Sequence, residues 1–194
     1  IARGVTLEKL HEITKIDYFF LHKYLNLYNM ECRLKEGNID AETYLRAKKM
    51  GYPDKAIERL SGGKVPMHRD PVYKMVDTCA AEFAAETPYF YATYDDENEA
   101  KEFLDERPKK PCVVVLGSGP IRIGQGIEFD YASVHCVWML KQAGYDVVMI
   151  NNNPETVSTD FDTADRLYFE PLTAEDVLGV IATEKPVGVV AAFG

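Results

Sequence analysis

Basic residues are scarce in this sequence. Its 194 residues contain 22 lysines and arginines against 31 aspartates and glutamates, which gives a formal net charge of -9 at pH 7. Affinity for DNA and RNA comes largely from lysines and arginines that displace counterions, so this chain would be repelled by a phosphate backbone. We therefore expect no nucleic-acid partner.

Cysteine is also scarce, and long apolar runs are missing. The four cysteines lack CxxC spacing and the four histidines lack ligand spacing, so neither a metal site nor a disulfide framework is indicated and a reducing cytoplasm fits best. Apolar runs such as Cys112–Leu116 are far shorter than the ~20 residues that span a bilayer, so we expect no membrane segment. The chain has no initiator methionine and finishes in a strand-like run before Gly194, so we interpret it as cut at both ends.

The first third of the sequence has a helical period. Leu7, Leu10 and Ile13 follow Thr6 at three-residue intervals, and three longer patterns begin behind an aspartate and stop at a glycine. These are Asp17 to Gly37, with the apolar face Phe20, Tyr24, Leu27, Met30 and Leu34; Asp40 to Gly51; and Asp54 to Gly62. We expect a small all-helical lobe, in which Thr6 and Asp17 can cap the first two helices and Asp40 and Asp54 open the next two. A lobe of ~60 residues buries only ~60% of its surface, so we expect it to self-associate or pack on a neighbour.

The periodicity weakens between Ser61 and about Pro111, where prolines interrupt it and Asp95–Glu106 is strongly acidic. We interpret this stretch as a crossing segment. Its aromatic cluster, from Tyr89 to Tyr94, should lie against a domain because such rings bury large areas when they find a surface.

From Cys112 onward, short Val and Ile runs alternate with helical stretches, which is typical of parallel strands joined by crossover helices. Thr173, with Asp176 three residues later, should cap the last helix. The predicted fold is thus an all-helical lobe followed by a parallel-sheet, Rossmann-like α/β domain. We expect four strands, at Cys112–Leu116, Asp146–Ile150, Arg166–Phe169 and Val187–Ala192.

A glycine-rich loop, GSGPIRIGQG, follows the first of these strands. Its residues of interest are Gly117, Gly119, Arg122, Gly124 and Gly126. A dinucleotide fingerprint needs a third glycine where Arg122 stands and an acidic residue at the end of the next strand, where three asparagines stand. A Walker loop needs a Gly-Lys-Ser or Gly-Lys-Thr tripeptide, which is also missing. The remaining alternatives are a ligand loop of another kind and a tight turn with a purely structural role.

The loop is followed by further polar sequence. It continues as GIEFDY, and the next strand finishes in NPETVSTD at 153–160. Both segments should leave the carboxyl edge of adjacent parallel strands, where open α/β sheets bind ligands. The sequence therefore predicts a polar site at this edge.

At these residues the sequence resembles the large subunit of glutamine-dependent carbamoyl-phosphate synthetase. The strings RIGQGIEFDY and NPETVSTD are long and specific, and ADRLYFEPLTAEDVL and EKPVGVV are similar to the same family. The resemblance implies a helical oligomerisation domain at 1–69, a crossing segment and linker at 70–110, and at 111–194 the biotin-carboxylase-like, pre-ATP-grasp domain of the carbamoyl-phosphate-forming half. The stretch from Leu60 to Asp70 is shorter than is usual in the family.

The resemblance also implies a function. Such a subunit, a cytoplasmic ligase of arginine and pyrimidine biosynthesis, makes carbamoyl phosphate from bicarbonate, ammonia released by a glutaminase small subunit, and two ATP. ATP and Mg (or Mn) would be handled by an ATP-grasp region beyond Gly194, so we expect no cofactor or metal here and negligible turnover by this chain alone. Its partners would be the rest of the large subunit, the glutaminase subunit and a second helical lobe.

By the same resemblance, Gly126, Glu128 and Glu155 lie along an internal passage for carbamate. The alternative for Gly126 is a turn with positive φ, and for the two glutamates a structural salt bridge or a helix-start carboxylate. Arg122 could guide an anion or form a structural ion pair. We assign no catalytic residue.

Two other classes of function remain as alternatives. One is a non-enzymatic binding or oligomerisation module, since Asp40–Ser61 superficially resembles a helix-turn-helix DNA reader, although the acidic charge argues against DNA. The other is a complete small nucleotide-binding protein, which the unfinished sheet argues against.

Overall fold

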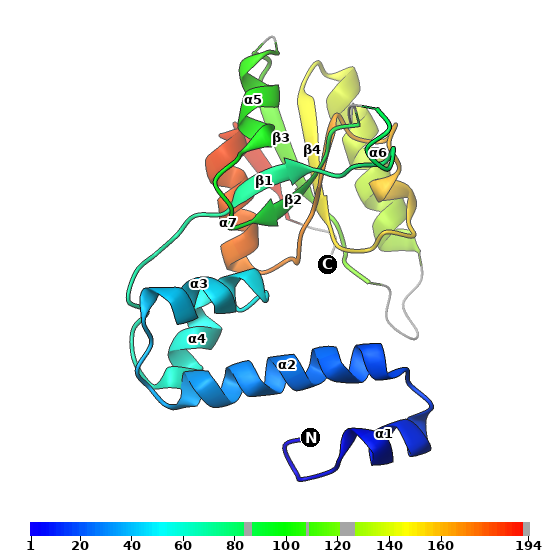
Figure 1. Ribbon diagram of the computed structural model, residues 1–194. Helices are drawn as coiled ribbons and strands as arrows, with labels where there is room; N and C mark the ends of the chain where they lie inside the picture. Colours follow the sequence, from blue (N-terminus) through cyan, green and yellow to red (C-terminus); the bar gives the residue numbers. More distant parts are fainter. Residues whose placement is uncertain (84–86, 108, 121–126, 192–194) are drawn as a thin grey trace. The chain divides into compact units, whose positions relative to one another are not determined.

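The computed structural model describes the whole chain except residues 84–86, 108, 121–126 and 192–194 (Figure 1). The chain divides into two compact units, Ile1–Arg69 and Asp70–Gly194. The first unit contains only helices, and the second contains a sheet with helices on both faces. This mixture of an all-helical part and an α/β part is the fold class that the sequence predicted.

Four helices make up the helical unit. They are α1 (Leu7–Thr14), α2 (Tyr18–Lys35), α3 (Ala41–Lys49) and α4 (Asp54–Ser61). The predicted caps Thr6 and Asp17 are confirmed, and Asp40 caps the helix that it was expected to open. Each of these side chains accepts a hydrogen bond from a backbone N–H in the first turn.

Asp54 opens α4 and Gly62 follows its last residue, as predicted, but the Asp54 side chain does not cap the helix. Asp54 is the first residue of α4, its N-cap is Pro53, and no side chain caps this helix. Instead, one oxygen of the Asp54 carboxylate lies 3.0 Å from Lys48 Nζ and accepts a hydrogen bond from the Tyr44 hydroxyl at 2.9 Å. Lys48 is buried, and a buried ammonium needs a carboxylate partner, so Asp54 serves that charge rather than the helix end.

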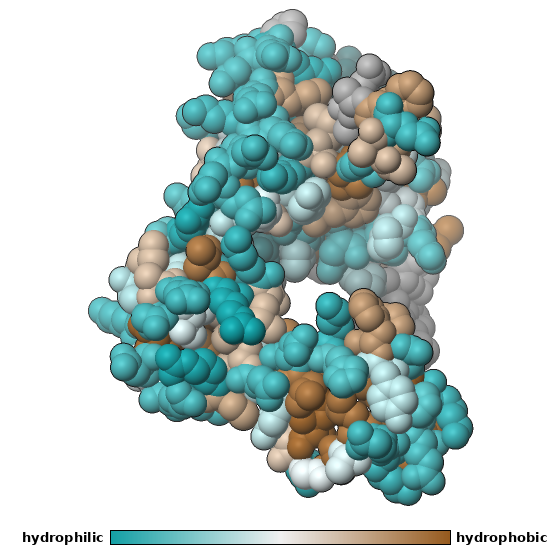
Figure 2. Space-filling model, viewed as in Figure 1, coloured by the Kyte–Doolittle hydropathy of each residue, from teal (hydrophilic) through white to brown (hydrophobic). Residues whose placement is uncertain are grey.

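The predicted apolar face of α2 is buried over only part of its length. Met30 and Leu34 pack with Tyr44, Ala47 and Ile57 in the core of the unit. Nearer the start of α2, the side chains of Phe20 and Tyr24 are 56% and 59% exposed. They belong to a set of exposed large apolar residues in and beside these two helices, called here the exposed apolar surface on α1 and α2: Val5, Ile13, Ile16, Tyr18, Phe19, Phe20 and Tyr24. Figure 2 shows hydrophobic residues in brown at the surface of this unit.

The second unit is built on a six-stranded sheet with the order β1-β2-β5-β4-β3-β6. All neighbouring pairs are parallel except β1 and β2. The strands are β1 (Val72–Met75), β2 (Tyr89–Thr93), β3 (Cys112–Leu116), β4 (Asp146–Asn151), β5 (Arg166–Phe169) and β6 (Gly188–Val190). The remaining elements are α5 (Glu99–Asp105), α6 (Glu128–Gln142), a 3-10 turn η1 (Val157–Thr159) and α7 (Ala174–Glu184), which Thr173 caps as predicted.

The four strands predicted after residue 111 are present as β3, β4, β5 and β6, but the sheet has two further strands that were not predicted. The stretch interpreted as a crossing segment contributes β1, β2 and α5 to the second unit, and β2 pairs in parallel with β5. Phe90 of β2 is fully buried, so the aromatic cluster does lie against a domain, as one of its strands. The two strands are short and Pro71 and Pro88 stand just before them, which hid their period of two.

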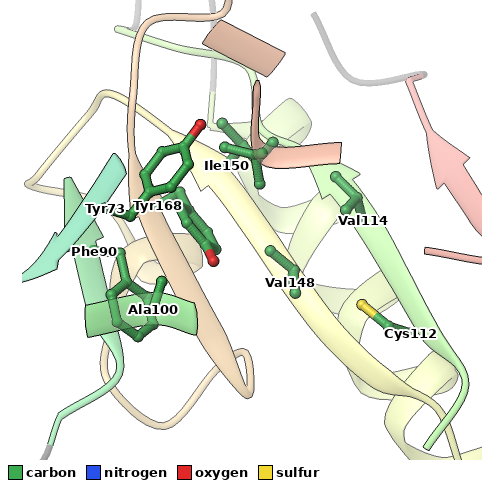
Figure 3. Packing of buried hydrophobic residues seen from close by; sticks show 9 residues of the cluster. Tyr73, Phe90, Ala100, Cys112, Val114, Val148, Ile150 and Tyr168 are labelled. Atoms are coloured by element: carbon green, nitrogen blue, oxygen red, sulfur yellow. The ribbon is translucent and has the colours of Figure 1, made fainter. Parts of the chain in front are cut away.

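Alternate residues of the central strands face two separate apolar cores. Val114, Val148, Ile150 and Tyr168 face α5 and α7, together with Tyr73 and Phe90 from β1 and β2 (Figure 3). Val115, Val147, Met149 and Leu167 face α6. Strands buried on both faces read as continuous Val and Ile runs, which is why β3 and β4 were recognisable in the sequence.

No helix within the described parts of the chain is long and apolar enough to cross a membrane.

Candidate functional site

The glycine-rich loop and the end of β4 lie side by side at the carboxyl edge of the sheet. The ladder between β3 and β4 extends to Gly117, whose backbone N–H donates to the Ile150 carbonyl at 2.8 Å. The chain therefore enters the loop directly beside Asn151, the last residue of β4. The predicted convergence of the two polar segments is correct for these residues.

Asn151 connects the two segments through its side chain. Its Oδ1 accepts hydrogen bonds from the backbone N–H groups of Gly119, at 3.0 Å, and Asn152, at 2.9 Å. Its Nδ2 donates to Ser158 Oγ at 3.0 Å. Asn151 is completely buried, so these bonds replace the water that its amide loses. One side chain thus fixes the start of the glycine loop relative to the NPETVSTD segment.

Two glycines of the loop are required by this arrangement. A Cβ atom at Gly117 would lie 2.5 Å from Asn151 Cγ, which no side chain tolerates. Gly119 has φ +71°, and a Cβ there would lie 3.2 Å from Asn152 Oδ1. At these two positions glycine makes room for asparagine side chains.

The start of α6 is fixed to the same segment. Asp130 Oδ2 accepts a hydrogen bond from the backbone N–H of Ser158 at 3.3 Å, and its Oδ1 is buried without a partner among the residues that the structure describes. Thr159 Oγ1 is held by the carbonyls of Asn153 and Thr156, and the Thr159 carbonyl accepts from the Tyr89 hydroxyl at 2.8 Å. The segment after β4 is therefore attached to α6, β2 and the glycine loop at once.

Glu128 and Glu155 stand at the exposed side of this arrangement. Glu128 is the first residue of α6, where a carboxylate is favoured by the helix dipole. Glu155 lies in the turn before η1, and its backbone N–H donates to Asn153 Oδ1 at 3.1 Å. Among the described residues, neither carboxylate forms a salt bridge, so both remain available to solvent or to a ligand. Gly124, Gly126 and Arg122 lie outside the described residues.

The residues described at this edge do not fit a Mg–ATP site. The loop N–H of Gly119, which a phosphate would need, already donates to Asn151, and the room beside Gly117 is filled by the same side chain. Groups of three or more His, Cys, Asp or Glu placed to hold a metal ion are not found in the described part of the chain. The geometry suits a shaped polar wall rather than a phosphate cradle.

A titratable carboxyl lies close to the same edge. Glu170 follows β5, is buried, and accepts a hydrogen bond from the backbone N–H of Ala92 on β2. Burial, with a smaller contribution from the charge of Asp176, raises the pKa of Glu170 to about 7, against the effect of the Ala92 bond. This carboxyl therefore changes charge near neutral pH.

Sequence reasoning missed Asn151, Asp130 and Ser158. The asparagines at 151–153 were interpreted only as lacking the acidic residue that a dinucleotide site needs. The available signal was a polar residue at the end of a strand that is otherwise apolar, because such a residue is buried with its strand and must find hydrogen-bond partners.

The fold and the site define a class of protein. It has an α/β domain whose mostly parallel sheet is covered by helices on both faces and carries a polar site at its carboxyl edge, and a helical unit precedes this domain in the chain. Two family models match these parts. One, the carbamoyl phosphate synthase preATP-grasp domain, matches residues 109–194, and the other, the carbamoyl-phosphate synthetase large chain oligomerisation domain, matches residues 1–76. The chain belongs to the family of carbamoyl-phosphate synthetase large chains.

Proposed function

We propose that this chain serves the ATP-dependent synthesis of carbamoyl phosphate from bicarbonate and glutamine-derived ammonia, as part of a cytoplasmic glutamine-hydrolysing ligase. The observation that carries the proposal is that two different domains of one enzyme chain match in succession along this sequence. Arginine and pyrimidine biosynthesis are the pathways that consume this product. Two ATP and Mg (or Mn) belong to the proposal for the whole enzyme.

Within that enzyme, the carboxyl-edge site is proposed to form part of the wall of a passage that carries carbamate. Glu128 and Glu155 are exposed and unpaired among the described residues, and the backbone around them is fixed through Asp130 and Asn151. Carboxylates repel an anion at short range, so their role is to bind water and backbone amides and to keep the passage open. Gly126, the last residue of the glycine-rich loop in the sequence, would leave room for the passing molecule.

We propose no catalytic residue in this chain. The described site offers a fixed polar surface, whereas phosphoryl transfer needs cations and metal ligands around the phosphates. The chain alone is therefore expected to show negligible turnover, and the glutaminase subunit and the rest of the large chain are its proposed partners.

The passage is tested by Gly126→Leu in a complete large chain that contains this sequence, assembled with its glutaminase subunit. The matched control is Gly63→Leu, because Gly63 has open space around it and a φ that other residues adopt. Three rates are measured: bicarbonate-dependent ATP cleavage, ATP synthesis from carbamoyl phosphate, and glutamine-dependent carbamoyl-phosphate formation.

The expected result is loss of overall synthesis while both partial reactions survive, with Gly63→Leu behaving as wild type. Unchanged overall synthesis in Gly126→Leu contradicts the passage. Loss of all three rates shows instead that Gly126 is needed for folding. Glu128→Gln and Glu155→Gln then ask whether charge matters, because each keeps the side-chain shape.

Assembly is the second proposed function. The exposed apolar surface on α1 and α2 lies in the part of the chain that matches an oligomerisation domain. Large apolar side chains grouped on one surface are typical of protein contacts, so we propose that this surface binds a second copy of the helical unit.

A further inference from the structure

A pocket of about 540 Å³ lies at the opposite edge of the sheet from the candidate site. The first residues of β3, β4 and β5, which are Cys112, Asp146 and Arg166, line its floor. Its walls come from α5, from the segment that leads into β3, and from the end of α7. All of these belong to the second unit, and the proposed passage uses none of them.

The floor of the pocket is a fixed network of buried charges. The Arg166 guanidinium donates to Glu184 at 2.9 and 3.0 Å, and lies 3.3 Å from Asp146 Oδ2. The Tyr168 hydroxyl adds a hydrogen bond to Glu184 at 2.7 Å. Arg166 and Glu184 are both buried, so the floor is rigid and its charges are matched internally.

The walls carry more positive than negative charge among the residues that the structure describes. Six cationic side chains line the pocket against three carboxylates, although acidic residues outnumber basic ones in the chain as a whole. Among the described residues, four of the six make no ion pair; these are Lys101, Arg107, Lys109 and Lys185. Lys110, the fifth, is 3.8 Å from Asp146, and Arg166 is the sixth. The pocket is thus a local concentration of positive charge in an acidic protein.

Apolar residues line the pocket together with these cations. Leu104, Pro111 and Val187 line the pocket, and the Arg107 guanidinium stacks over the Phe103 ring at 4.8 Å from its centroid. A volume of this size is in the range of small-molecule sites, which combine apolar walls with a few polar groups that orient the ligand.

We propose that this pocket binds a small organic phosphate. A phosphate monoester carries nearly two negative charges at neutral pH and three acceptor oxygens, which suits several converging lysines and arginines better than the single charge of a carboxylate. Its phosphate contacts Lys101, Arg107, Lys109 and Lys185, and its organic part lies against Leu104, Pro111 and Val187. The proposal does not depend on the passage, because the two sites share no residue.

The test is calorimetric titration of the protein with phenyl phosphate, inorganic phosphate and phenol. Phenyl phosphate should bind more tightly than inorganic phosphate, because it also covers the apolar wall, and phenol should show no binding. Raising the salt concentration should weaken the binding, since exposed cations are screened. Amide shifts in the NMR spectrum should concentrate at Lys110, Cys112 and Lys185 when phenyl phosphate is added.

Lys101→Glu with Arg107→Glu is the decisive variant. Both side chains are exposed, so the fold should persist, and the reversed charges should weaken phenyl phosphate binding about tenfold or more. Lys55→Glu with Arg59→Glu is the matched control, because these residues line a basic depression on the helical unit. The control should bind as wild type.

Three outcomes overturn the proposal. They are no binding of phenyl phosphate by the wild-type protein, equal weakening in the variant and the control, and amide shifts that lie away from the pocket. The amide shifts are measured on the wild-type protein, so they can still contradict the proposal if the variant fails to fold.

Discussion

The side chain of Asn151 determines the geometry of the candidate site more than the glycines of the loop do. Its buried amide accepts a hydrogen bond from the glycine loop and donates one to Ser158. Gly117 and Gly119 have no side chain and so leave room for the asparagine side chains beside them. The residues that would touch a ligand, Glu128 and Glu155, take their positions from contacts that other side chains make.

Asn151→Ala is expected to lower the free energy of unfolding by about 2 kcal/mol. The change leaves the backbone N–H of Gly119 and the Ser158 hydroxyl without their partners inside the protein, and unpaired buried polar groups cost about 1–3 kcal/mol each. Urea denaturation followed by circular dichroism measures the effect. Asn152→Ala is the control, since its side chain is exposed and should change stability by less than about 0.5 kcal/mol. Equal effects of the two changes would contradict the role given to Asn151.

The raised pKa of Glu170 predicts that the stability of the folded protein depends on pH. Its pKa is raised from 4.5 to about 7 because it is buried, so between these values the folded state holds a proton that the unfolded state has lost. The contribution of Glu170 to the free energy of unfolding is therefore greatest below the unfolded pKa of 4.5. It falls as the pH rises toward 7, by about 3 kcal/mol at most.

Glu170→Gln isolates this effect, because glutamine cannot ionise and keeps the shape of the protonated acid. The difference in unfolding free energy between the variant and the wild-type protein should grow from pH 5 to pH 7 and then level off, as measured by urea titration at each pH. A constant difference over this range would show that Glu170 titrates normally.

At the scale of elements, the end of α7 is attached to the sheet through charge. Glu184 is the last residue of α7, and it receives hydrogen bonds from Arg166 and Tyr168 of β5 inside the protein. The Arg166 and Glu184 side chains are 2% and 0% exposed, so solvent does not weaken their interaction.

Glu184→Gln should lower the free energy of unfolding by about 3 kcal/mol, because it leaves the Arg166 charge buried with only the longer contact to Asp146. Glu12→Gln removes one partner of the exposed ion pair with Lys9 and should cost less than about 1 kcal/mol. Guanidinium denaturation of both variants checks the ranking. Similar losses in the two variants would mean that the buried network contributes no more than a surface pair.

The elements that the sequence predicted well are those with strong local signals. Strands β3, β4 and β5 are runs of apolar residues between helices, and Thr6, Asp17, Asp40 and Thr173 each stand directly before a helix that they cap. The misses depend on partners distant in the sequence. Strand β2 is defined by its pairing with β5, so it could not be recognised from its neighbours in the chain. The contacts of Asp54 with Lys48 and Tyr44 depend likewise on how α4 packs against α3.

At the candidate site, too, the features with a local signal in the sequence were predicted and those that depend on distant partners were not. The two motifs at the carboxyl edge were found because the edge follows from strand direction alone. The hydrogen bonds of Asn151 and Asp130 were not predicted, since they join residues 32 and 28 positions apart and depend on where the backbone turns.

At the scale of the whole molecule, the two units differ in how completely they bury their apolar residues. In the second unit the sheet is covered on both faces. In the helical unit, α1 has no buried residue at all, and seven large apolar side chains between Val5 and Tyr24 are exposed. Apolar side chains that stay exposed on such short helices gain stability when another surface packs on them.

Tyr24→Asp should therefore weaken self-association of the chain, because it places a charge within the exposed apolar surface on α1 and α2. Sedimentation equilibrium over a range of concentrations should show a dissociation constant at least about tenfold higher than that of wild type, a loss of about 1.4 kcal/mol. Tyr131→Asp is the matched control, since Tyr131 is 63% exposed, close to the 59% of Tyr24, but lies on α6. If both variants associate as wild type does, or if the wild-type chain stays monomeric at high concentration, the surface on α1 and α2 does not join two copies. If only Tyr24→Asp dissociates, the exposed apolar surface on α1 and α2 makes the contact and Tyr131 takes no part in it.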